Sequence, residues 1–294
     1  MVPRYFPGGK RADELLISRF SEMFLPPYHR PSRAAARLHY RGGPLVRLWW
    51  RVQNHQMRRL LKMPPELLPD TPLPSGFENI GVGNEFYVAL EGGRILPQRG
   101  RIAAFAGADS VALDSGKRID ADVVVFATGW RQGVPFLEDD LRKRVVRDGT
   151  FRLYRQILPP AVPRLGFNGY SSSIAAQLTS EISAHWLSQC FRGELALPSV
   201  DEMDREIGRV GAWMRERFPA RPEGYFVGPY LAHYLDELLS DMGLRTNRTD
   251  TTVKEFMGPL WPSRYRDVGA ERRRARDGEL AAVPRQVHHR NEPG

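Results

Sequence analysis

Three small residues, Ala127, Thr128 and Gly129, follow a short apolar run and could form the turn of a ligand site. The run covers residues 123–126 and is flanked by polar residues, which predicts a strand buried on both faces. Small residues let the backbone turn sharply and approach a ligand, and open α/β sheets bind nucleotides at the carboxyl ends of such strands. The competing interpretation is an ordinary core strand with a tight exit.

The hydroxyl cluster of Ser171, Ser172 and Ser173 is a second group that could bind a ligand. The cluster follows Gly169 and precedes a strongly helical pattern, so it adjoins unpaired backbone N–H groups and the positive end of a helix dipole. Such a helix start suits an anionic or carbonyl-bearing group. The alternative is that one serine only caps the helix.

Several other kinds of site are not supported. The sequence contains no Gly-x-Ser-x-Gly, which argues against a serine hydrolase. Asp236 and Glu237 are adjacent and so point apart on a helix, which argues against paired acid–base carboxylates. Cys190 is the only cysteine and the seven histidines show no metal-ligand spacing, so we expect neither a disulfide framework nor a metal site.

The composition favours a globular chain without nucleic-acid or membrane-spanning character. With 294 residues, 41% of them hydrophobic, the chain can bury a sizeable core and hold two domains. The net charge of +9 comes from dispersed residues of which only five are lysine, so we expect no nucleic-acid partner. No apolar run approaches the ~18 residues of a membrane span. We expect a cytoplasmic protein.

The elements that would position the small-residue turn are short. Residues 84–90 predict a helix and residues 101–105 predict a strand. Residues 111–119 predict a hairpin that turns at Gly116 and leads into the apolar run. Upstream of them, residues 63–74 contain five prolines and predict an irregular crossing segment.

Two helices are predicted nearer the N-terminus. Residues 11–24 have apolar residues at helical spacing after Asp13, a suitable N-cap. Residues 45–61 predict a basic amphipathic helix with one apolar face, formed by Leu45, Leu48, Trp49 and Val52. A helix of this kind can lie at a membrane interface, or can pack on its own domain with a solvated basic face, and both interpretations stay open.

Past residue 130 the sequence predicts two strands, three helices and a tail. The strands cover residues 152–154 and 164–170, the helices begin near residues 174, 199 and 230, and a polar basic tail without structure begins at residue 266. Ser199 and Glu202 form a capping box, which marks the start of the second helix.

Seven pieces of the sequence, in this order and at compatible spacing, resemble the carboxyl-terminal half of the flavin-containing monooxygenases. They are residues 126–130 (Phe-Ala-Thr-Gly-Trp), 135–137, 153–154 with 159–160, 165–169, Thr179 with Glu181, Ala184 and Trp186, Gly193 with 197–199, and 234–238. Together they cover residues 120 to 240 and are far more specific than any one of them alone.

The resemblance implies an α/β fold, namely the C-terminal portion of a flavoenzyme with two dinucleotide-binding domains, Rossmann-like and of the glutathione-reductase type. Residues 1–127 would be a remnant of the NADPH-binding domain with a helical segment, residues 128–265 the C-terminal part of the FAD-binding domain, and residues 266–294 a disordered basic tail. FAD and NADPH are the implied cofactors, and the implied cofactor-binding residues are Ala127, Thr128, Gly129, Trp130, Ser171, Ser172, Ser173, Gln177 and Thr179.

The implied activity is oxygenation by the flavin. NADPH reduces the flavin, the reduced flavin activates dioxygen, and one oxygen atom passes to a soft nitrogen or sulfur nucleophile or to a carbonyl of a small substrate. The cofactor performs the chemistry in this scheme, so no side chain is needed as an acid, base or nucleophile.

The sequence departs from the family pattern at the phosphate-binding turns. The family uses a Gly-x-Gly-x-x-Gly for each dinucleotide, but Gly81 and Gly83 are followed by Asn84, Glu85 and Phe86, with no third glycine. We therefore expect an N-terminally truncated member that lacks its first portion. The alternative is a non-catalytic remnant, or a basic module that binds a membrane surface or a partner protein.

Overall fold

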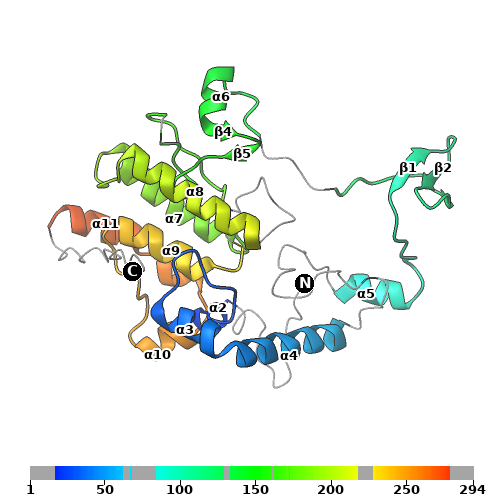
Figure 1. Ribbon diagram of the computed structural model, residues 1–294, viewed down its shortest axis with the longest axis horizontal. Helices are drawn as coiled ribbons and strands as arrows, with labels where there is room; N and C mark the ends of the chain where they lie inside the picture. Colours follow the sequence, from blue (N-terminus) through cyan, green and yellow to red (C-terminus); the bar gives the residue numbers. More distant parts are fainter. Residues whose placement is uncertain are drawn as a thin grey trace.

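The computed structural model describes residues 17–61, 67, 84–128, 133–160, 162–171, 173–217 and 228–278. Helices dominate these ranges, with two small antiparallel sheets between them (Figure 1). None of the helices in these ranges combines the length and the apolar character needed to cross a bilayer. The proline-rich segment predicted over residues 63–74 lies outside these ranges, except for residue 67.

Three helices occupy the N-terminal part of the described chain: α2 (Arg19–Glu22), α3 (Arg33–Arg41) and α4 (Gly43–Leu61). Ser18 and Ser32 cap the first two, since each hydroxyl accepts a hydrogen bond from a backbone N–H three residues later. The predicted helix over residues 11–24 is therefore wrong in its start, because Ser18 is extended and begins a single turn; residues 11–16 lie outside the described ranges.

The predicted helix over residues 45–61 is confirmed as α4, but its faces are arranged differently from the prediction. Trp50 is buried and donates its indole N–H to the Phe24 carbonyl (2.7 Å), and the Trp49 ring stacks on the Phe24 ring at 4.4 Å. The remaining apolar residues of the predicted face point to solvent, with exposed fractions of 54%, 53% and 42% for Leu45, Leu48 and Val52. The two tryptophans thus anchor α4 to the residues after α2.

The short elements before residue 121 match the prediction. Helix α5 spans Asn84–Glu91, and strands β1 (Ile102–Phe105), β2 (Ser110–Leu113) and β3 (Arg118–Asp120) form one antiparallel sheet in that order. Gly116 has a φ of +82°, a conformation that glycine adopts without strain, and it closes the turn between β2 and β3.

The predicted buried strand over residues 123–126 is wrong. These residues form no strand, and the side chains of Val123, Val125 and Phe126 are exposed by 77%, 82% and 64%. A strand buried on both faces needs neighbours that accept its hydrogen bonds and cover its side chains, and sheet β1–β2–β3 ends at β3 without pairing to this segment.

The two strands predicted after residue 150 are also wrong. Helix α6 (Asp139–Val145) leads into β4 (Val146–Arg147) and β5 (Thr150–Phe151), after which the chain turns, with only an isolated bridge between Tyr154 and Leu158. Arg155 and Gln156 have φ values of +53° and +59°, so extended pairing stops there. Residues 164–170 form turns, a bend and irregular backbone with no strand, and Arg164 and Gly169 also have positive φ.

The three helices predicted for the C-terminal half are confirmed as α7 (Ala176–Phe191), α8 (Val200–Arg217) and α9 (Leu231–Asp241). Helix α7 ends two residues before Gly193, whose φ of +70° terminates it. The capping box of α8 forms as predicted: the Glu202 N–H donates to the Ser199 hydroxyl (3.3 Å) and the Ser199 N–H donates to the Glu202 carboxylate (3.0 Å).

The residues after 250 form α10 (Thr252–Met257), a 3-10 turn (Pro262–Tyr265) and α11 (Val268–Arg276), so the described chain from residue 266 is more ordered than its composition predicts. The prediction of a structureless tail from residue 266 is therefore wrong for α11. Val268 is fully buried, Arg248 binds Glu271 of α11, and Arg272 of α11 binds His185 of α7. Residues 279–294 lie outside the described ranges.

The main core joins the N-terminal segment to the C-terminal helices. Helices α7 and α9 pack against each other, α11 packs on α7, and α10 packs on α2 (Figure 1). The residues after α2 also contact the C-terminal part of the chain: the Tyr230 hydroxyl donates to the Pro26 carbonyl (2.8 Å), and the Trp213 indole N–H donates to the Pro27 carbonyl (2.9 Å). The largest fully buried side chains of this core are Trp186, Tyr230, Tyr234 and Tyr265.

Candidate functional site

Backbone and ring contacts hold residues 167–170, the segment that leads into α7. Phe167 is buried and its N–H donates to the Ile157 carbonyl (2.8 Å), while the Tyr170 ring packs on the Phe151 ring at 4.9 Å. Gly169 has a φ of +83°, which lets the chain turn toward the helix. Ser171 and Ser173 therefore lie immediately before α7, as the sequence predicted.

Two of the predicted site residues contact each other. The Ser171 hydroxyl donates to the Thr179 hydroxyl oxygen (3.1 Å), and both side chains are buried. Thr179 in turn donates to the Ala176 carbonyl (3.2 Å) in the first turn of α7. The pair therefore supports the turn from inside the protein and does not present its hydroxyls to a ligand.

Ser173 has a structural role that matches the capping alternative. Its hydroxyl accepts a hydrogen bond from the Ala175 N–H (2.9 Å), and its backbone forms an isolated parallel bridge with Gly228. These contacts shape the chain just before the helix.

The first turn of α7 is open to solvent. Ala175, the residue at the N-cap position, makes no side-chain capping bond, and the first turn contains no acidic residue. Ile174, Ala176 and Gln177 are exposed, and we call them the α7 N-terminal surface. Its free backbone N–H groups and positive dipole end are suited to an electron-rich ligand group.

Ala127 and Thr128 are not brought to this surface. Both residues are exposed and lie in the irregular segment between β3 and α6. In Figure 1 the described residues of this segment next to the small sheet lie apart from α7. Gly129, Trp130 and Ser172, the other predicted cofactor-binding residues, lie outside the described ranges.

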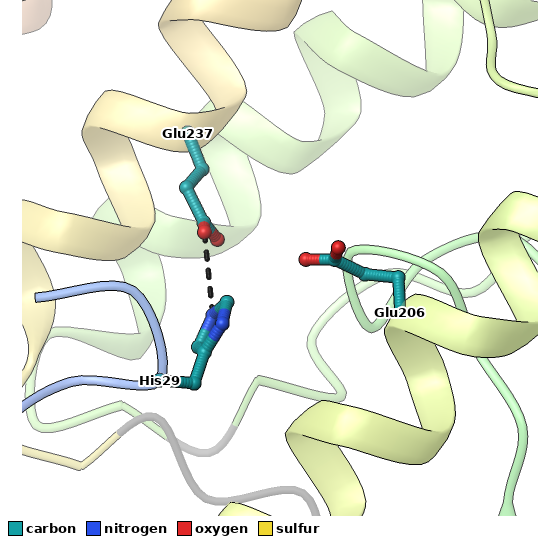
Figure 2. A group of neighbouring side chains, drawn as sticks. All are labelled: His29, Glu206 and Glu237. Carbon is teal, nitrogen blue, oxygen red and sulfur yellow. Dashed lines mark ion pairs between the residues drawn. The ribbon is translucent and has the colours of Figure 1, made fainter. Parts of the chain in front are cut away.

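A second cluster of functional groups lies between the residues after α2 and helices α8 and α9. His29, Glu206 and Glu237 come from these three places and point toward one another (Figure 2). Their ligand atoms lie within 4.8 Å of each other, a spacing that could hold a metal ion. The His29 Nε2 atom is 3.3 Å from the Glu237 carboxylate, and the His29 side chain is only 2% exposed.

Arg155 occupies the centre of this cluster. Its guanidinium forms two bonds with Asp241 (2.8 and 3.1 Å) and lies 3.4 Å from each of Glu206 and Glu237. Burial alone would raise the pKa of Glu237, but Arg155 and the hydrogen bond from His29 outweigh it and lower that pKa to about 2. Glu237 is therefore ionised, and Arg155 neutralises it.

The cluster is better explained as an ion network than as a metal site. Glu206 also binds Arg30 and Arg209, so three guanidinium groups face the three carboxylates of Glu206, Glu237 and Asp241. A divalent cation would lie close to the Arg155 charge and would find no uncompensated negative charge. We call this group the Arg155 network.

Sequence reasoning missed the Arg155 network, because Arg155 lies far from its carboxylate partners along the chain. Between 51 and 86 residues separate them. The sequence did give one signal: Asp236 and Glu237 are adjacent on a helix and were predicted to point apart. They do, since Asp236 pairs with Arg19 while Glu237 faces Arg155.

Comparisons with known proteins place the chain among flavoproteins. The family model described as flavin-binding monooxygenase-like matches residues 89–289. The match includes α7, α8, α9 and the Arg155 turn, and it leaves α2, α3 and α4 outside.

The curated relatives that match the chain are also named as flavin-containing or FAD-dependent monooxygenases. Flavin-containing monooxygenase 5 of Rattus norvegicus is 29% identical over 60% of this chain and 34% of its own length, and flavin-containing monooxygenase 3 of the same species is 32% identical over 50% and 29%. The FAD-dependent monooxygenase DEP4 of Fusarium langsethiae is 23% identical over 79% of this chain and 48% of its own length. The chain thus spans about a third of the length of these mammalian relatives.

Among solved structures, the S-allyl-L-cysteine S-oxygenase from Allium sativum matches with a TM-score of 0.42 and 22% identity, over 60% of this chain and 38% of the other. The family model carries the assignment, since it covers more than half of the chain. It confirms the expected class, an α/β chain corresponding to the C-terminal portion of a Rossmann-like flavoenzyme. The chain belongs to the flavin-binding monooxygenase-like family.

Proposed function

We propose that this chain forms the flavin-facing part of a monooxygenase that uses FAD, NADPH and dioxygen to oxygenate a small molecule. The family assignment supports this proposal. The observation that carries it is the α7 N-terminal surface, an uncapped helix start with exposed Ala176 and Gln177, next to the buried Ser171–Thr179 pair.

These residues fit the electron-rich edge of a flavin ring. The backbone N–H groups of Ala176 and Gln177 and the Gln177 amide would donate hydrogen bonds to it, and the helix dipole would favour negative charge there. When bound, the flavin supplies the activation of dioxygen. The substrate class in this proposal is a soft nitrogen or sulfur nucleophile or a carbonyl compound.

We expect these 294 residues to bind FAD weakly, with a dissociation constant above ~10 μM, because a Gly-x-Gly-x-x-Gly turn for the pyrophosphate is absent from their sequence. Titration of FAD, followed by quenching of its fluorescence, measures the affinity. Gln177→Glu places a negative charge at the α7 N-terminus and should weaken binding by about 2- to 5-fold.

Asn247→Asp is the matched control, since it makes the same charge change at an exposed residue in the loop between α9 and α10. It should leave the affinity for FAD unchanged. Equal effects of the two variants, or an absence of saturable binding, would contradict the assignment of the α7 N-terminal surface to the flavin. Stoichiometric flavin that survives gel filtration would contradict the expected weak binding.

We also propose a cytoplasmic location. Cys190 is the only cysteine and is free, which supports a reducing compartment. Fractionation of cells that express the full-length protein, followed by immunodetection, tests the location.

A second candidate function is peripheral contact with an anionic membrane through α4, as part of the enzyme or as a non-catalytic module. Leu45, Leu48 and Val52 are exposed on α4, and Arg47 and Arg51 are exposed beside them. Residues 23–65 contain no Asp or Glu, so no acidic side chain of this stretch opposes an anionic surface. Apolar residues flanked by arginines are the combination that binds such lipid surfaces.

We predict that the protein sediments with vesicles of phosphatidylcholine and phosphatidylserine at low salt, and much less with phosphatidylcholine alone. Leu48→Glu should reduce this binding by ~10-fold or more, because it removes apolar burial and adds a repelled charge. Val88→Glu is the matched control, since Val88 is an exposed apolar residue of α5. Binding that is independent of salt, or equally reduced by both variants, would contradict a membrane role of α4.

A further inference from the structure

The Thr179 side chain joins the first turn of α7 to the chain that precedes the helix. Thr179 is 0% exposed, and its hydroxyl oxygen accepts a hydrogen bond from the buried Ser171 hydroxyl (3.1 Å). The Thr179 hydroxyl in turn donates to the Ala176 carbonyl (3.2 Å), with the Ala175 carbonyl as a second acceptor at 3.5 Å. The hydrogen bonds therefore run in one direction, from Ser171 through Thr179 to the helix backbone.

This connection takes the place of an ordinary helix cap. A capping side chain fixes the entering chain by accepting hydrogen bonds from the N–H groups of the first turn, as Ser32 does for α3. At α7, the N-cap residue Ala175 has no such side chain, and Thr179 fixes the entering chain through hydroxyl and carbonyl oxygens. The N–H groups of Ala176 and Gln177 are thus left to a ligand.

The position of the Thr179 hydroxyl follows from the packing of α7. Leu178 and Ile182, which flank this turn of the helix, are 2% and 0% exposed in the main core. A threonine in a helix has few favourable side-chain rotamers, so its hydroxyl is placed by the backbone of the helix. Ser171 is then held to Thr179, because a buried hydroxyl that loses its partner has no water to replace it.

We propose that Thr179 is a positioning residue for the α7 N-terminal surface. Its hydroxyl binds Ser171 on the buried side of α7 and thereby fixes the first turn, residues 176–179, without using the N–H groups that face the ligand. The nature of the ligand rests on the proposed function. The positioning is a property of the chain without ligand and can be measured on it directly.

Hydrogen exchange, measured by mass spectrometry on the full chain without ligand, tests the positioning. Thr179→Val keeps the shape of the side chain but removes the hydroxyl, so Ser171 loses its acceptor. A peptide covering residues 176–182 should exchange ~5-fold faster or more in this variant. A peptide covering α11 should exchange as in the wild type, which shows that the variant is folded. Ser171→Ala removes the same hydrogen bond from its other end and should accelerate exchange of residues 176–182 as well.

Two control variants separate the Thr179 hydroxyl from its surroundings. Thr179→Ser keeps the hydroxyl and loses only the methyl group, so exchange of residues 176–182 should stay within ~2-fold of the wild type. Ser183→Ala removes a different buried hydroxyl of the same helix, one that lies 3.1 Å from the Tyr234 hydroxyl of α9. It should leave the exchange of residues 176–182 unchanged.

Three outcomes would overturn the proposal. They are wild-type exchange of residues 176–182 in Thr179→Val, exchange in Thr179→Ser as fast as in Thr179→Val, and an equal increase in Ser183→Ala. The second would assign the effect to packing of the methyl group, and the third to general loosening of α7. FAD titration of Thr179→Val separates this inference from the proposed function: if exchange accelerates as expected but the affinity for FAD is unchanged, the positioning stands and the assignment of the ligand fails.

Discussion

Replacement of Arg155 by Met is expected to lower the free energy of unfolding by about 3–5 kcal/mol, the cost of breaking a buried ion pair by removing one partner. Arg155 is the member of its network that touches all three carboxylates, Asp241, Glu206 and Glu237. Methionine fills part of the volume but leaves Asp241 and Glu237 without their nearest positive charge. It also keeps the unfavourable positive φ without the contacts that stabilise it.

Urea denaturation followed by circular dichroism measures the loss. Arg152→Met is the matched control, because Arg152 forms a similar pair with Asp204 (2.5 Å) whose side chains are 23% and 43% exposed. A partly exposed pair of this kind contributes at most about 1 kcal/mol. Equal losses in the two variants would contradict the central role of Arg155.

The pH dependence of stability gives the same variant a second readout. The folded-state pKa of Glu237 is about 2, below its usual value of 4.5, so its contribution to stability is present above pH 4.5 and is lost as the pH falls toward 2. Arg155→Met removes the largest of the charges that lower the pKa of Glu237, so this pKa should rise in the variant. The stabilisation that depends on ionised Glu237 should then be smaller, so the variant should lose less stability than the wild type as the pH falls from about 5 toward about 2.

Local signals in the sequence predicted the elements that depend only on local chemistry. The capping box of Ser199 and Glu202 and the glycine turn at Gly116 form as expected, because each is complete within a few residues. The buried strand at residues 123–126 does not form, because burial of a strand depends on its neighbours and not on its own composition.

Two further errors have a similar origin. The turn at Arg155 and Gln156 uses positive φ in residues that rarely adopt it, and the carboxylates of α8 and α9 hold the Arg155 side chain in place there. Helix α11 is rich in arginine and looks unstructured by composition. It is ordered because Val268 is buried and Glu271 pairs with Arg248, contacts that composition does not reveal.

The candidate site was predictable in part. The motif resemblance selected Ser171 and Thr179, and the structure joins them by a hydrogen bond, although it buries them. Gln177 lies on the exposed first turn, as a ligand contact requires. Tyr234 belonged to the same resemblance but carried no sign of its contact with the Arg155 carbonyl, since 79 residues separate the two.

Replacement of Glu22 by Gln is expected to lower the free energy of unfolding by about 2–3 kcal/mol. Glu22 lies in α2 and is 4% exposed, yet it caps a distant helix: it accepts from the backbone N–H groups of Ala232 (2.7 Å) and His233 (3.4 Å) at the start of α9. It also binds the His233 ring (2.6 Å). Tyr230, at the N-cap position of α9, supplies no side-chain cap, so Glu22 takes this role.

Glutamine is a sensitive replacement, because it keeps the shape of the side chain while turning one acceptor oxygen into a donor NH₂ that faces other donors. Glu202→Gln is the matched control, since Glu202 caps its own helix at an exposed position. It should cost no more than about 1 kcal/mol. A loss in Glu22→Gln as small as in this control would show that the buried cap is not important for stability.

The Glu22–His233 pair also predicts a change on the alkaline side. Burial lowers the pKa of His233, but the hydrogen bond and the charge of Glu22 outweigh it and raise that pKa above its usual value of 6.5. The pair therefore contributes its full stabilisation below pH 6.5 and loses it as the pH rises through the folded-state pKa. In Glu22→Gln this loss should disappear, so unfolding curves at pH ~6 and ~9 should differ in the wild type more than in the variant. An NMR titration of the His233 ring should show its pKa falling in the variant, and an unchanged His233 titration would contradict the assigned pairing.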